Sequence, residues 1–152
     1  TGSYVRDKDG VDGAYMICEM FSYYATKGIS LLDKLDELYE AYGYCLNTLH
    51  SYEFDGSAGF AKMQSIMQAF RGDIKEFGGK KVIKLLDYAP GLDGLPKSDV
   101  LKFLLEDNCS IVVRPSGTEP KLKTYISVSA ENKEAAEKVE AEIRKSAEEF
   151  LK

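Results

Sequence analysis

The residues from Arg114 to Lys123 form the stretch of the sequence whose types and spacing predict the most specific chemistry. This stretch reads Arg-Pro-Ser-Gly-Thr-Glu-Pro-Lys-Leu-Lys. The planar guanidinium of Arg114 can donate two parallel hydrogen bonds, and Lys123 can add a second positive charge. Ser116 and Thr118 offer hydroxyl donors, and Gly117 allows neighbouring backbone N–H groups to turn toward a single point. Together these groups are the donors that a phosphate dianion needs.

The positive charge of such a site has to come from side chains. Many phosphate loops lead into a helix and use its positive N-terminal end, but the residues from 121 to 128 have the period-two alternation of a strand. A second interpretation stays open at this point, because a glycine between two prolines is also typical of an ordinary hairpin turn with exposed polar residues.

The stretch resembles the phosphate-binding loop of the C-terminal domain of the phosphoglucomutase/phosphomannomutase (α-D-phosphohexomutase) family. A second segment, Val-Arg-Asp-Lys-Asp-Gly-Val at residues 5–11, resembles the stretch that follows the sugar-recognition loop at the end of that family's third domain. The resemblance implies that Arg114, Ser116, Gly117, Thr118 and Lys123 bind the phosphate of a hexose phosphate.

The same resemblance makes Lys8 a candidate catalytic residue, since the family's matching lysine lies near the reacting sugar phosphate. There it could neutralise charge or assist proton transfer. An exposed turn lysine among several carboxylates is the alternative.

The family's other motifs are not found between residues 1 and 152. These motifs are a phosphoserine loop similar to Thr-Ala-Ser-His-Asn-Pro, a magnesium loop similar to Asp-Gly-Asp-Gly-Asp-Arg, and a sugar loop similar to Gly-Glu-Glu-Ser. The resemblance therefore implies a C-terminal fragment, inactive by itself, whose partners are hexose phosphates and the preceding domains of the same chain. Magnesium would be bound in those domains, with no cofactor within this stretch.

Composition restricts the class of protein further. With 44% hydrophobic and 30% charged residues, the chain can bury a core, and a net charge of −5 argues against a nucleic-acid or anionic-membrane surface. No apolar run is long enough for a membrane span. The three cysteines are distant from one another, which predicts reduced, mostly buried thiols in a cytoplasmic protein, and a single histidine, His50, excludes a multi-histidine metal site.

Hydrophobic periodicity predicts an α+β fold with four to five strands in a mostly antiparallel sheet and helices on one face. The family's fourth domain, which resembles the TATA-binding protein, has this kind of architecture. The expected helices begin near Asp9 or Asp12, Ser30, Ser57 and Asn132, and the third has an apolar face of Phe60, Met63, Ile66, Met67 and Phe70. The expected strands are residues 44–54, 81–88, 100–105, 110–113 and 121–128.

A domain boundary is predicted near Gly43. Residues 1–43 carry a net charge of −4 and contain a helix that is apolar almost all round, which predicts the end of a preceding α/β domain. Residues 44–152 carry a net charge of −1 and form the phosphate-binding domain. Two functions remain open: the phosphate-gripping end of a mutase, acting on glucose or mannose phosphates, or a stand-alone anion-binding or interaction module without catalysis.

Overall fold

The computed structural model of the chain describes residues 8–117 and 119–151. The chain divides into two compact units, Thr1–Tyr42 and Gly43–Lys152. No helix among the described residues has both the length and the apolar character that crossing a bilayer requires.

The first unit consists of two capped helices. Helix α1 (Gly10–Ala25) begins where the Asp9 carboxylate accepts hydrogen bonds from the N–H groups of Val11 and Asp12, each at 3.0 Å. Helix α2 (Leu31–Tyr42) begins with a reciprocal pair, in which the Asp33 N–H donates to Ser30 Oγ and the Ser30 N–H donates to the Asp33 carboxylate. Neither helix has a buried residue in this structure, although α1 is strongly apolar.

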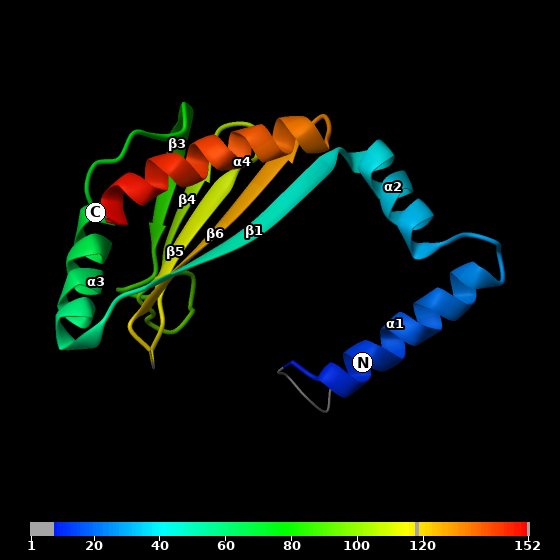
Figure 1. The fold of residues 1–152 in the computed structure, drawn as a ribbon, viewed down its shortest axis with the longest axis horizontal. Helices are drawn as coiled ribbons and strands as arrows, with labels where there is room; N and C mark the ends of the chain where they lie inside the picture. The colour runs from blue at the N-terminus through cyan, green and yellow to red at the C-terminus, as the bar shows by residue number, and fades with distance from the viewer. Residues whose placement is uncertain (1–7, 118, 152) are drawn as a thin grey trace. The chain divides into compact units, whose positions relative to one another are not determined.

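The second unit is built on an antiparallel sheet of six strands in the order β1-β6-β5-β4-β3-β2 (Figure 1). The strands are β1 (Tyr44–Glu53), β2 (Glu76–Phe77), β3 (Lys80–Asp87), β4 (Leu101–Leu105), β5 (Ser110–Pro115) and β6 (Lys121–Ala130). The two-residue β2 is the strand that periodicity did not predict. Because β5 and β6 lie inside the sheet, both of their edges are held by hydrogen-bonded neighbours.

Two helices complete this unit. Helix α3 (Gly56–Phe70) begins after Asp55, two residues before the predicted cap, and the Asp55 side chain makes no capping hydrogen bond. Helix α4 (Lys133–Glu148) begins as predicted at Asn132, whose side-chain oxygen accepts from the Ala135 N–H at 2.9 Å. It is followed by the short 3₁₀ helix η1 (Glu149–Leu151).

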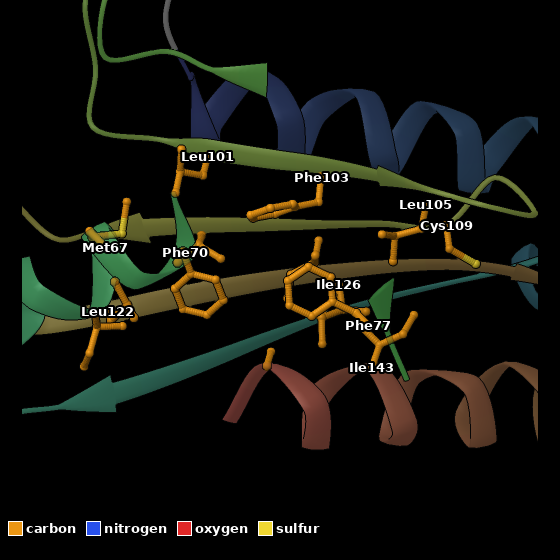
Figure 2. Close-up of a cluster of buried hydrophobic side chains, with 14 of the residues drawn as sticks. Met67, Phe70, Phe77, Leu101, Phe103, Leu105, Cys109, Leu122, Ile126 and Ile143 are labelled. Atoms are coloured by element: carbon orange, nitrogen blue, oxygen red, sulfur yellow. The ribbon is translucent and has the colours of Figure 1, made fainter. Parts of the chain in front are cut away.

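The core fills the space between the sheet and these helices (Figure 2). Residues on β4, β5 and β6 alternate between buried and partly exposed, so one face of the sheet packs against the helices while the other stays open. Phe70 of α3, Phe77 of β2 and Phe103 of β4 are fully or almost fully buried, with ring centroids 5.0–6.3 Å apart. The α+β class with helices on one face of an antiparallel sheet is therefore confirmed, with six strands instead of four to five.

The packing predictions for Phe60 and for the cysteines were wrong. Phe60 is 53% exposed and lies outside the buried face of α3. Glu140 of α4 is buried, although it is charged, and is only 6% exposed. It is buried because Thr48 Oγ1 donates to its carboxylate at 2.8 Å and His50 Nε2 lies 2.6 Å from the same oxygen. Cys18 and Cys45 are exposed, and of the three cysteines only Cys109 is buried.

Candidate functional site

The two cations of the predicted phosphate site lie opposite each other on neighbouring inner strands. Arg114 of β5 and Lys123 of β6 are register partners, about 5 Å apart at their Cα atoms by ordinary strand spacing. Val113 and Leu122, the residues before them, are buried, so the alternation of the strands places Arg114 and Lys123 on the open face of the sheet. Their separation is thus set by the hydrogen-bonded ladder.

Both cations keep their charge available for a ligand. Neither Arg114 nor Lys123 makes a side-chain hydrogen bond or an ion pair within the part of the chain that the structure describes. The adjacent Lys121 behaves differently, since its ammonium lies 3.1 Å from the Glu53 carboxylate and 3.4 Å from that of Glu119. The hydrogen bond with Glu53 and the charge of Glu119 raise the pKa of Lys121.

The turn after Arg114 brings small polar groups to the same end of the sheet. The Ser116 N–H donates to the Lys121 carbonyl oxygen at 2.7 Å, which closes the turn between β5 and β6. A side-chain carbon placed on Gly117 would meet no atom within 4 Å, so a ligand can approach the backbone there. Thr118 lies outside the described residues, and its predicted hydroxyl donor stays a prediction.

A pocket of about 290 Å³ adjoins this turn. It brings Arg114, Ser116 and Gly117 together as predicted, but Lys123 does not line it. Pro115, the last residue of β5, also lines it. The remaining lining residues come from α3 and from the segment before β4, and sequence reasoning missed them: Phe60, Met63, Gln64, Ser98 and Asp99. They are separated from Arg114 by up to 54 positions and follow no common spacing, so the sequence carries no signal that could have found them.

Asp99 is held at the pocket by a charged cluster. Arg71, the C-cap of α3, donates from Nη2 to Asp99 at 2.6 Å and from Nε to Asp87 at 2.9 Å. These two hydrogen bonds raise the pKa of Arg71. Burial alone would raise the pKa of Asp87, but the hydrogen bonds from Arg71 and from the Ala89 N–H outweigh burial and lower it.

Comparison with known proteins identifies the family. Residues 55–146 match the family described as phosphoglucomutase/phosphomannomutase, C-terminal domain, and they cover most of the second unit. The chain belongs to this family. This finding agrees with the resemblance carried by residues 114–123.

Curated phosphoglucomutases are similar over almost the whole chain. The phosphoglucomutase of Staphylococcus aureus strain MSSA476 is 37% identical over 153 residues, covering 92% of this chain and 28% of the relative. The phosphoglucomutase of Staphylococcus saprophyticus is 34% identical over 139 residues, covering 84% of this chain and 25% of the relative. The chain therefore spans about a quarter of the length of these relatives.

A solved structure shares the fold. The open form of parafusin, a phosphoglucomutase from Paramecium, superposes with a TM-score of 0.66 over 97% of this chain and 28% of its own, at 19% identity. The fold of a phosphoglucomutase C-terminal region is therefore the fold of this chain.

Lys8, the candidate catalytic residue, precedes α1 by two positions and is exposed. It belongs to the first unit and the phosphate residues belong to the second, so its role stays a prediction from family resemblance. The residues that the structure describes contain no group of three or more His, Cys, Asp or Glu side chains that could hold a metal ion.

Proposed function

We propose that this chain is the phosphate-gripping C-terminal part of a phosphohexose mutase, an isomerase of carbohydrate metabolism that interconverts hexose 1-phosphate and hexose 6-phosphate. In this proposal residues 1–43 complete a preceding α/β domain, and residues 44–152 hold the phosphate that does not react. The substrate would be a phosphate of glucose or mannose. The curated relatives support glucose, because their names are phosphoglucomutase.

The observation that carries the proposal is the pair of cations beside the turn. Arg114 and Lys123 face the open side of the sheet without partners among the described residues. A cation without a carboxylate partner keeps its electrostatic interaction for an incoming anion. Ser116 and the open backbone at Gly117 add neutral donors at the same place, and all of these residues lie in the stretch that resembles the family's phosphate loop.

A fixed grip on the distant phosphate has a clear use in such a reaction. The hexose must turn around between two half-reactions, so one site has to accept a phosphate from either end of the sugar. Residues that contact only phosphate can do this without regard to the sugar carbon that bears it. The binding energy from the distant phosphate then orients the reacting centre.

The remaining chemistry belongs to other parts of the proposed full-length enzyme. By resemblance to the family, preceding domains would supply the phosphoserine and bind magnesium, which neutralises charge during phosphoryl transfer. Lys8 would contribute a positive charge or a proton near the reacting phosphate. A cytoplasmic location is part of the same proposal.

Titration with inorganic phosphate tests the proposed grip. Backbone amide NMR signals of Ser116, Gly117 and Lys123 should shift as phosphate is added, and sulfate should compete. The chain by itself should show no turnover of glucose 1-phosphate, whereas the corresponding full-length protein should show mutase activity. Phosphate binding without activity in the full-length protein would favour the non-catalytic module, and absence of shifts at the turn would contradict the proposed grip.

A further inference from the structure

The pocket beside the turn has more room and more kinds of polar group than a phosphate needs. At about 30 Å³ for each water-sized group, its volume of about 290 Å³ holds about ten such groups, whereas a phosphate has five heavy atoms. The pocket is also lined by the amide of Gln64 from α3, and by the hydroxyl of Ser98 and the carboxylate of Asp99 from the segment before β4. An amide and a carboxylate are suitable partners for hydroxyl groups.

The carboxylate of Asp99 is the informative member. A negative charge beside Arg114 weakens phosphate binding, so it does not help a site meant for phosphate alone. The guanidinium of Arg71 holds one oxygen of Asp99 at 2.6 Å, which fixes the carboxylate and partly offsets its charge. No other hydrogen bond to Asp99 is present within the described residues, so its second oxygen can accept from a ligand hydroxyl.

The exposed ring of Phe60 is a further indication that the pocket suits a ligand larger than phosphate. Phe60 and Gln64 stand one turn apart on α3, so they share a side of the helix at the pocket. The ring of Phe60 is 53% exposed although its neighbours on the buried face are covered. An exposed ring next to hydrogen-bonding groups offers an apolar surface to the C–H groups of a sugar and polar partners to its hydroxyls.

We propose that Phe60, Gln64 and Asp99 form a sugar subsite that contacts the hydroxyl groups of the hexose whose phosphate is bound by the turn. This inference rests on the proposed function and deepens it, because it assigns recognition of the sugar, in addition to the phosphate, to this domain. Arg71 is a positioning residue that fixes Asp99.

The test compares hexose phosphate with inorganic phosphate on the same chain. The dissociation constants of glucose 6-phosphate, glucose 1-phosphate and inorganic phosphate are measured by amide NMR titration. At least one hexose phosphate should bind three times more tightly than inorganic phosphate, as one additional hydrogen bond predicts. Gln64→Ala should lower this ratio, because one hydrogen bond to the sugar is lost while the phosphate-binding residues of the turn are unchanged. Asp99→Asn should lower the ratio and strengthen inorganic phosphate binding, since a negative charge is lost.

Gln68→Ala is the matched control, because Gln68 is an exposed glutamine on the same helix that does not line the pocket. Equal ratios in the unchanged chain, in Gln64→Ala and in Gln68→Ala would overturn the sugar subsite while leaving the phosphate grip intact. If inorganic phosphate fails to bind at the turn, the proposed function and the subsite are both overturned. Gln64 is exposed, so its substitution should not disturb folding, and an unchanged NMR spectrum away from the pocket would verify this.

Discussion

Removal of the Arg114 guanidinium gives the sharpest test of the grip. The side chain has no carboxylate partner among the described residues, so Arg114→Ala breaks no internal ion pair and should not unfold the chain. Its effect can then be assigned to the ligand. Lys123, its register partner on β6, allows a direct comparison of two cations held on the same ladder.

The expected magnitudes differ between these two residues. A charge-assisted hydrogen bond contributes roughly 1.5–3 kcal/mol, so Arg114→Ala should raise the dissociation constant for inorganic phosphate by about ten- to a hundredfold or more. Arg114→Lys should recover only part of this loss, because an ammonium cannot donate two parallel bonds. Lys123 does not line the pocket, and a unit charge at 4 Å in water contributes about 1 kcal/mol, so Lys123→Ala should cost about fivefold.

Amide NMR titrations at low and high salt are the appropriate assay. The loss in Lys123→Ala should shrink at high salt because the interaction of an exposed charge is screened. Lys138→Ala, on the exposed side of α4, serves as the control and should leave the dissociation constant unchanged. If Arg114→Ala and Lys138→Ala bind phosphate equally well, the residues around the turn do not form a phosphate site.

Four other predictions concern the scaffold. A side-chain carbon on Gly78 would lie 2.5 Å from the backbone of α4, whereas one on Gly79 would meet open space. In urea unfolding, Gly78→Ala should therefore lower the free energy of unfolding by about 1–3 kcal/mol more than Gly79→Ala. Equal losses would contradict this close approach. His50→Leu should lower the free energy of unfolding by about 1.5–3 kcal/mol, because it removes a partner of buried Glu140. A double-mutant cycle with Glu140→Leu should show coupling between the two residues, and additive losses would refute their interaction. Burial and a hydrogen bond to a glutamate raise the pKa of Tyr52 from 10.0 to about 12. The stability that the protonated tyrosine contributes is therefore full below pH 10 and is lost as the pH rises toward 12. Tyr52→Phe should lose less stability than the unchanged chain over that interval, and an equal loss would argue against this contribution. Amide hydrogens of α1 and α2, which have no buried residues, should exchange faster than those of β5 and β6, and equal protection would show that the first unit is stable by itself.

Much of the fold was predictable because its signals are local. Alternation along residues 121–128 gave the strand and the face of every side chain on it, and the cap at Asn132 gave the start of α4. The strand β2 could not be predicted, because two residues show no period and its pairing with β3 depends on the turn at Gly78 and Gly79. Phe60 and Met63 both fit the helical spacing of the apolar face, yet Phe60 is exposed and Met63 is buried. Their exposure depends on where α3 lies relative to the end of the sheet, which the spacing does not contain.

The candidate site was predictable to a smaller extent. Arg114 and Ser116 were found because a short motif holds them in one stretch, and the register that places Lys123 opposite Arg114 follows from a hairpin. Asp99 and Gln64 depend on how α3 and the segment before β4 pack at the turn, which is a property of tertiary structure. The burial of Glu140 has the same origin, since its partners Thr48 and His50 are about 90 positions away.

The mounting of the two cations on paired strands has a consequence for how this chain can change in length. A residue inserted into the turn between Ser116 and Pro120 would alter the loop, but Arg114 would still lie opposite a lysine in the same register. A residue inserted between Leu122 and Lys123 would take the buried position of Leu122 and move that leucine by one position to the open face. Natural and engineered variants of this domain should therefore tolerate insertions and deletions in the turn and exclude them from the first residues of β6.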